Sequence, residues 1–203
     1  DPTPPGRGGH HGGMLFEHWG ATEAERQAEV VGDELIADPP VSATRSISLA
    51  AEPDEVFGWL AQMGFGKAGW YSYDLLDNLG RRSARQLEPT WQVDGAGQTV
   101  PGGPISFAVT HLRRPDHLVL AILDQGLPGH RIDFTLAYQL HRLDTDADAD
   151  TNVGPGTRLV SRARIRVDGP IGRPATALLG AGDGVMVRRQ LLGLADRCGR
   201  WPT

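Results

Sequence analysis

The chain lacks the residues and runs that would mark several classes of protein. Its 203 residues include a single cysteine, Cys198, which excludes an internal disulfide and fits a reducing cytoplasm. No apolar run approaches the roughly 20 residues of a membrane-spanning helix, so we expect no membrane span. The N-terminus has no basic-then-apolar order typical of a secretory signal, and we therefore expect a cytoplasmic protein.

Clustered positive charge and catalytic signatures are absent as well. The formal net charge is −5 without a long basic run, which disfavours nucleic-acid binding because that requires a positive patch. No Ser-His-Asp order, metal-ligand cluster or dinucleotide fingerprint occurs, so we expect neither a metal nor a cofactor. The chain does have 39 % hydrophobic residues, enough for one domain around one core.

The N-terminal part divides into a tail and two predicted helices. Residues 1–13, rich in Pro, Gly and His, have little to bury and predict a disordered extension, leaving 14–203 as one domain. Thr22 and Glu25 fit a capping box for a helix that stops at Gly32. A second helix is predicted over Pro53–Met63, because its first turn does not need the N–H that proline lacks.

Strand patterns dominate the middle of the chain. Alternating polar and apolar side chains, or short apolar runs, predict strands over 43–50, 105–111, 117–124, 130–141 and 157–167. Short connections between the last four indicate an antiparallel meander. Alternation assigns the arginines of the last strand to an outer, solvated face; they are Arg158, Arg162, Arg164 and Arg166.

An amphipathic helix is predicted from about Asp183 to Arg197. Its apolar stripe consists of Val187, Leu191, Leu194 and Cys198. Upstream, Gly180 and Gly182 weaken a helical stretch and predict a break or bend. A curved sheet that grips such a helix leaves space between the two, and preformed spaces of this kind bind apolar molecules.

Aromatic residues crowd one short segment. Three of them occur in Gly69-Trp70-Tyr71-Ser72-Tyr73-Asp74, and such large side chains must line a core or a cavity. Asp74 is predicted to cap the short helix that follows, since its carboxylate can accept backbone N–H groups.

Five segments carry a likeness to a known family. They are ATRSISLAA (43–51), VFGWLAQMG (56–64), GWYSYDLLDNLG (69–80), WQ (91–92) and GTRLV (156–160). Over roughly residues 15–198 the chain resembles the bacterial branch of the START/Bet v 1-like superfamily, the polyketide cyclase-like or SRPBCC proteins. The resemblance implies an α+β helix-grip fold, in which a curved antiparallel β-sheet wraps around a long C-terminal α-helix and two short helices follow the first strand. It also implies a hydrophobic cavity but no particular chemistry.

Ten residues are candidates for the wall of that cavity. They are Trp70, Tyr71, Tyr73, Trp91, Phe107, Val109, His111, Phe134, Tyr138 and Met186. His111 follows Phe107 and Val109 in register and is a candidate general base, and the Tyr138 hydroxyl is a candidate for orienting a ligand. Core packing, or for His111 a solvated strand end, is the competing interpretation.

We therefore expect a bacterial protein, monomeric or homodimeric, that binds a small hydrophobic molecule such as a lipid or a polyketide-like compound. The second hypothesis is an enzyme: a cyclase, dehydratase or hydrolase acting on a polyketide-like substrate. The third is a protein-interaction or regulatory module with a vestigial cavity. No catalytic motif in the sequence decides among them.

Overall fold

One antiparallel sheet organises the structure. The computed structural model describes residues 17–126, 129–144, 156–170 and 172–200, so the predicted disordered extension lies outside the described residues. The strands are β1 (Val41–Leu49), β2 (Thr99–Pro101), β3 (Ser106–Arg113), β4 (His117–Gln125), β5 (Arg131–Leu143) and β6 (Gly156–Asp168). Their order in the sheet is β1-β6-β5-β4-β3-β2, so the predicted meander is confirmed. β1 forms one edge of the sheet by pairing with β6.

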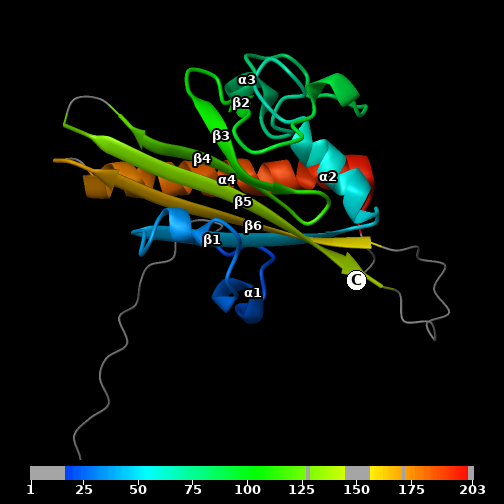
Figure 1. Cartoon of the computed structure of the whole chain (residues 1–203), viewed down its shortest axis with the longest axis horizontal. Helices are drawn as coiled ribbons and strands as arrows, with labels where there is room; N and C mark the ends of the chain where they lie inside the picture. Colours follow the sequence, from blue (N-terminus) through cyan, green and yellow to red (C-terminus); the bar gives the residue numbers. More distant parts are fainter. Residues whose placement is uncertain (1–16, 127–128, 145–155, 171, 201–203) are drawn as a thin grey trace, which may run out of the picture.

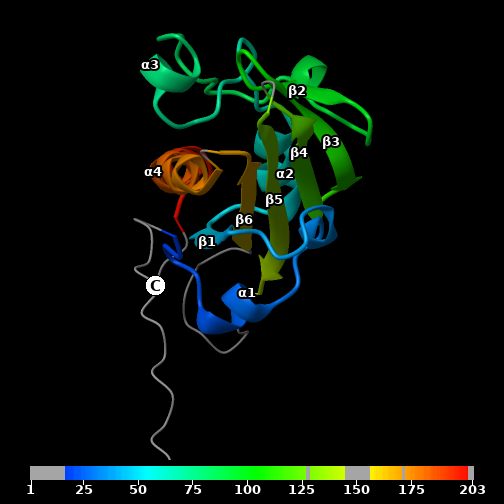
Figure 2. The same ribbon diagram turned by 90° about the vertical axis from the view of Figure 1, so that its left-hand side faces the viewer.

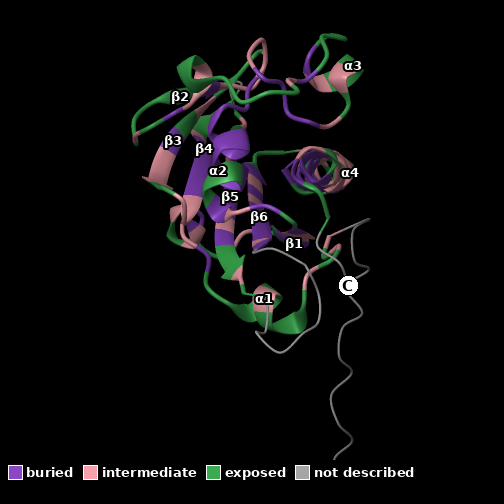
Figure 3. Cartoon of the chain, turned by 90° about the vertical axis from the view of Figure 1, so that its right-hand side faces the viewer, coloured by how far each residue is buried: buried purple, intermediate pink, exposed green. Residues whose placement is uncertain are grey.

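The long C-terminal helix, α4 (Gly172–Cys198), lies along one face of this curved sheet (Figure 1). Figure 2 shows α4 end-on, with the sheet on one side of it and α3 (Asp74–Asp77) above it. The side of α4 that faces the sheet is buried, and its outer side is not (Figure 3). This arrangement confirms the predicted α+β helix-grip fold.

The prediction of a break in the last helix is wrong. α4 continues for 27 residues through Gly180 and Gly182, and it begins about ten residues before the predicted start at Asp183. Each glycine costs only about 1 kcal/mol of helix propensity. The packing of α4 on β1 and β6 outweighs that cost, because tertiary contacts supply most of the stability of a helix in a protein.

The short helices follow local sequence signals. α2 (Pro53–Ala61) has Pro53 at its start, as predicted, and buries most of its side chains in the main core. The capping box of Thr22 and Glu25 is present at the start of α1 (Glu23–Gln27), but α1 ends well before Gly32 because Ala28 is already extended. Two 3₁₀ turns complete the elements, at Asp33–Leu35 and Pro89–Trp91.

The N-terminal segment covers part of the outer face of the sheet. Arg162 on β6 is 5 % exposed and donates to the Thr44 hydroxyl, to the Asp33 carboxylate at 2.7 Å and to three backbone carbonyls of residues 25–28. The assignment of this arginine to a solvated face is therefore wrong. Arg162 does lie on the outer face of the sheet, as predicted, but the N-terminal segment covers this face and excludes water from it.

The contact between the N-terminal segment and the sheet depends on pH through Glu25. Burial would raise the pKa of Glu25, but hydrogen bonds from Arg158 and Thr22 outweigh that effect and lower its pKa from 4.5 to about 2. Because the folded-state pKa lies below the ordinary value, the Glu25 carboxylate stabilises the fold above pH 4.5, and this contribution is lost as the pH falls toward 2.

We expect Glu25→Gln to lower the urea midpoint at neutral pH and to lower it progressively less in acid. Glu29→Gln, at an exposed position nearby, is the control; a deficit for Glu25→Gln that does not change with pH would contradict the assignment.

Two glycines of α4 predict opposite responses to the same substitution. A Cβ at Gly193 would lie 2.0 Å from the Tyr71 carbonyl oxygen, whereas a Cβ at Gly182 would meet no atom within 4 Å. We expect Gly193→Ala to destabilise the protein by about 2–3 kcal/mol through overpacking. Gly182→Ala should stabilise it by about 0.5–1 kcal/mol through helix propensity. Thermal unfolding measures both, and shifts of the same sign would show that α4 does not lie as described.

Candidate functional site

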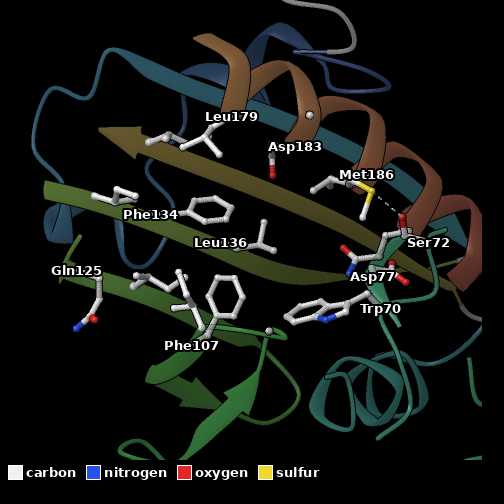
Figure 4. Close-up of a pocket in the computed structure, with 18 of the residues that line it drawn as sticks. Trp70, Ser72, Asp77, Phe107, Gln125, Phe134, Leu136, Leu179, Asp183 and Met186 are labelled. Atoms are coloured by element: carbon white, nitrogen blue, oxygen red, sulfur yellow. Dashed lines mark hydrogen bonds between the residues drawn. The ribbon is translucent and has the colours of Figure 1, made fainter. Parts of the chain in front are cut away.

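A cavity of about 790 Å³ lies between α4, the inner face of the sheet and residues 70–77 (Figure 4). Its volume is within the range of about 300–1,000 Å³ that is usual for small-molecule sites. Most of its wall is aromatic or aliphatic, with Phe107 from β3, Ile122 from β4, Phe134 and Leu136 from β5, and Met186 and Val187 from α4.

Aromatic rings form one continuous part of this wall. Trp70 packs edge-on against Phe107 with ring centroids 5.4 Å apart, and Phe107 packs in the same way against Phe134 at 5.8 Å. Phe134 and Leu136 are two residues apart on β5, so both side chains point to the same face and into the cavity. The row links the aromatic segment before α3 to the middle of the sheet (Figure 4).

The structure brings four of the ten candidate residues into the cavity wall: Trp70, Phe107, Phe134 and Met186. The other six lie elsewhere. Val109 is 1 % exposed and Tyr138 fully buried, both in the core. Trp91 packs against that core from its 3₁₀ turn, and Tyr73 is 41 % exposed at the surface.

His111 faces the opposite side of the sheet from the cavity, contrary to prediction. The pairing of β3 with β4 is irregular between Val109 and His111, and such a bulge reverses the alternation beyond it. The His111 Nε2 atom therefore lies 3.3 Å from the carboxylate of Glu34, in the segment that covers the outer face. In this position His111 cannot act as a base on a molecule in the cavity.

Tyr71 is turned into the core by its own backbone. Its φ of +58° lies in the left-handed region, and its hydroxyl donates to the Trp59 carbonyl at 2.9 Å and accepts from Gln62. The guanidinium of Arg197 on α4 lies over the ring, 4.3 Å from its centroid. Tyr71 thus anchors the end of α4 and does not border the cavity.

A buried ion pair connects β1 to α4 at the cavity. Arg45 Nη1 lies 2.7 Å from Asp183 Oδ2, and the two side chains are 1 % and 7 % exposed. Burial raises the pKa of Asp183, and the Arg45 guanidinium partly opposes that effect. Asp183 belongs to the cavity wall, so one carboxyl of this wall is held in place by a partner behind it.

A second polar contact lies farther along α4. The Tyr138 hydroxyl donates to Gln190 Oε1 at 2.6 Å, and Gln190 Nε2 lies 3.3 Å from the Met63 sulfur. Arg45, Ser161 and Tyr138 are neighbours across β1, β6 and β5, so they form one polar row under α4. This row meets Asp183 and Gln190, which are seven residues apart and lie on the same side of the helix.

Asp77 supplies a second carboxyl to the cavity wall. Both of its oxygens are enclosed by protein atoms, and the donors near them are the Ser72 hydroxyl and the backbone N–H groups of Tyr73 and Asp77. Burial raises the pKa of Asp77, the nearby Asp74 carboxylate raises it further, and hydrogen bonds from the Ser72 hydroxyl and from the backbone N–H groups of Asp77 and Tyr73 partly oppose this rise.

Asp74 has a different role from the predicted helix cap. It is the first residue of α3, whose N-cap position is occupied by Tyr73. Its Oδ1 atom accepts hydrogen bonds from the backbone N–H and the hydroxyl of Ser83. Asp74 thus ties α3 to the loop that follows it.

Sequence reasoning missed several residues of the wall. Leu136 could have been found, because it alternates with Phe134 on a predicted strand. Asp183 and Gln190 share the helical face of Met186 and Val187, which is a weaker signal. Nothing in the sequence indicates that Asp77 belongs to the cavity wall, because α3 is a single turn whose direction depends on its contacts.

The border of the cavity is apolar and partly exposed. Leu178 and Leu179, which belong to the wall, are 75 % and 44 % exposed, and Leu75 and Leu76 of α3 are 77 % and 72 % exposed. Within the described part of the chain, no helix is long and apolar enough to cross a membrane. The same residues contain no group of three or more His, Cys, Asp or Glu placed to hold a metal ion.

Comparisons with known proteins leave the family open. No family model and no curated protein matches the chain. A conserved protein from Geobacillus kaustophilus has a crystal structure that is similar over 77 % of this chain and 93 % of that one, with 14 % identity and a TM-score of 0.40. CalU16 from Micromonospora echinospora is similar over 77 % of this chain and 85 % of its own, with 14 % identity and a TM-score of 0.31. Similarities of this size decide neither family nor function.

The Arg45–Asp183 pair predicts strong coupling between two substitutions. Asp183→Leu removes the carboxylate partner of a buried guanidinium, and we expect a loss of about 3–5 kcal/mol. Adding Arg45→Met should recover most of that loss, because two apolar side chains of similar volume can replace a buried pair. Urea unfolding of the wild type, both single variants and the double variant measures the coupling. Additive losses would contradict the direct pairing.

Proposed function

We propose that the protein binds a small hydrophobic molecule, such as a lipid or a polyketide-like compound, between α4 and the sheet. The observation that carries this proposal is the unfilled space of about 790 Å³ with aromatic and aliphatic walls. The cavity is partly open to solvent, and an apolar hollow of this size is typical of small-molecule sites. An apolar guest would gain affinity there because the cavity exists before binding and the guest would bury its apolar surface against the wall.

The contacts of α4 support a cavity that persists without a guest. The helix is tied to β1 through Arg45 and Asp183, and to β5 through Tyr138 and Gln190. Moving α4 closer to the sheet would break buried, charge-assisted and neutral hydrogen bonds, which is costly when no water can replace them. A preformed site binds more tightly because little conformational freedom is lost on binding.

Filling the cavity tests the proposal. Leu136 projects from β5 into the space, so Leu136→Trp should place an indole where the guest would lie. We expect the variant to bind N-phenyl-1-naphthylamine at least about tenfold more weakly than the wild type, a difference of about 1.4 kcal/mol. Leu75→Trp makes the same change at an exposed site on α3 and should leave binding unchanged.

Fluorescence titration gives the affinities, and native mass spectrometry of the purified protein reports any guest that copurifies. Circular dichroism and thermal unfolding of both tryptophan variants show whether they are folded. Absence of saturable binding by the wild type across a panel of lipids and polyketide-like compounds would refute the proposal. If Leu136→Trp and the wild type bind the probe with equal affinity, the probe binds outside this cavity.

An enzyme, a cyclase, dehydratase or hydrolase for a polyketide-like substrate, is the second candidate. The observation in its favour is that two carboxyls with raised pKa values, Asp77 and Asp183, border an apolar cavity. Carboxyls whose pKa is shifted by burial inside a cleft are typical of acid–base catalytic sites. Turnover of a bound compound that is lost in Asp77→Asn, with binding retained, would favour catalysis over simple binding.

A protein-interaction or regulatory role is the third candidate, and the exposed leucines of α3 favour it. A patch of exposed apolar side chains is typical of interaction surfaces. We place this role after ligand binding, because the cavity is open and not filled by bulky side chains, as a vestigial one would be.

A further inference from the structure

Three leucines in and just after α3 are exposed to solvent: Leu75, Leu76 and Leu79. None of them belongs to the hydrophobic core of the described residues. A single exposed leucine is ordinary, but three within five residues form a patch of the kind found at interaction sites. The patch lies at the border of the cavity, because Asp77 of the same turn belongs to the cavity wall.

The polar side chains of this turn point inward and hold the leucines outward. Asp74 accepts from the Ser83 N–H at 3.1 Å, and Asn78 accepts from the Gly66 N–H at 3.0 Å. Asp77 is enclosed at the cavity wall. An ordinary surface helix buries its apolar side and exposes its polar side, so α3 has the reverse polarity.

The backbone at Leu79 adds to the cost of this arrangement. Its φ of +50° lies in the left-handed region, which side chains other than those of Asn and Asp seldom adopt. Burial of the side chain would compensate for that cost, but Leu79 is 77 % exposed. Such strain is concentrated at functional sites, and a contact outside the folded chain would explain a leucine at this position.

Exposed arginines follow the leucines directly. Arg81, Arg82 and Arg85 are exposed, and none of the described residues forms an ion pair with them. They lie beside α3, because the hydrogen bond from Ser83 to Asp74 folds this part of the chain back onto the turn. The chain as a whole has a net charge of −5, so these arginines are a local concentration of positive charge.

We propose that this surface, hereafter the α3 patch, docks on a membrane that contains anionic phospholipids. The patch consists of Leu75, Leu76, Leu79, Arg81, Arg82 and Arg85. A phospholipid membrane presents anionic headgroups above an apolar interior, so the arginines meet phosphates while the leucines enter the boundary beneath them. The inference goes beyond the proposed function and does not require it. If both hold, the border of the cavity faces the lipid phase from which an apolar guest is taken.

A second copy of this chain fits the α3 patch less well than a lipid surface does. A two-fold contact places identical surfaces against each other, so the arginines of both copies would be brought together. Like charges that face each other across an interface oppose association. Anionic headgroups instead complement the arginines.

Sedimentation with vesicles measures the docking. The purified protein is mixed with vesicles of phosphatidylcholine alone, or of phosphatidylcholine and phosphatidylglycerol in equal parts. We expect the wild type to bind the anionic vesicles at least about tenfold more tightly than the neutral ones. Added salt should reduce this difference, because it screens the attraction between the arginines and the headgroups.

Two double variants separate the apolar and the charged parts of the patch. Leu75→Gln with Leu76→Gln removes apolar surface and keeps good helix formers. Arg81→Gln with Arg82→Gln removes two charges. We expect each double variant to bind anionic vesicles at least about tenfold more weakly than the wild type.

The control changes the net charge by the same amount outside the patch. Arg26 on α1 and Arg113 at the end of β3 are exposed, and α1 lies on the opposite side of the molecule from α3 (Figures 1 and 2). Arg26→Gln with Arg113→Gln should bind the vesicles as the wild type does. Equal weakening in this control would show that net charge alone drives the binding and would refute the α3 patch.

Thermal unfolding gives a second, independent measurement. Leu79→Asn should weaken vesicle binding and leave the thermal midpoint equal or higher, because asparagine tolerates the left-handed conformation. Leu75→Gln with Leu76→Gln should unfold near the wild-type midpoint, because neither leucine belongs to the core. A large fall in either midpoint would assign these leucines to the fold and overturn the inference.

The outcomes distinguish docking from the proposed function. If the wild type does not bind anionic vesicles, or the leucine variant binds them equally well, docking is refuted and the cavity proposal stands. If the naphthylamine probe does not bind but vesicle binding follows the patch, the cavity proposal fails and docking stands. A wild-type dimer in analytical ultracentrifugation that the leucine variant lacks would assign the patch to a second copy and refute docking.

Discussion

The height of α4 above the sheet is the constraint on which the cavity depends. Two contacts set it, the Arg45–Asp183 ion pair and the Tyr138–Gln190 hydrogen bond. Apolar contacts alone are not directional and would favour collapse of the helix onto the strands. Buried polar contacts have preferred lengths and angles, and they are costly to leave unmade. The polar row under α4 therefore determines where the helix can lie, and the apolar space beside it is the result.

The same logic applies on the other face of the sheet. Arg162 would be an unpaired buried charge if the N-terminal segment did not supply carbonyls and the Asp33 carboxylate. Charged groups are buried only when such partners compensate for lost hydration. The sheet is thus held between α4 and the N-terminal segment by arginines that point to opposite sides, Arg45 inward and Arg162 outward. Both faces of β1 and β6 are specified by a buried guanidinium as well as by packing.

The polar side chains of the cavity wall differ in their hydrogen-bond and ion-pair partners. Asp183 and Gln190 are supported by side chains from the sheet, so their role in the fold is clear without a guest. Asp77 is held in position by its neighbours, and its enclosed carboxyl lies near the Ser72 hydroxyl and the backbone N–H groups of Tyr73 and Asp77.

Local periodicity and local chemistry were enough to predict several elements. The alternation along β5, the capping box of α1 and the proline at the start of α2 each predicted their element, while the family resemblance implied the helix-grip fold. The direction of individual side chains depended instead on contacts between segments that are far apart in the chain. One bulge in β3 turned His111 away from the cavity, the N-terminal segment buried Arg162, and packing kept α4 continuous through two glycines. These features differ in how far along the chain their determinants lie. Neighbours in the chain fix a strand or helix pattern, whereas partners far away in the sequence fix a bulge, a buried charge and the direction of a single turn such as α3.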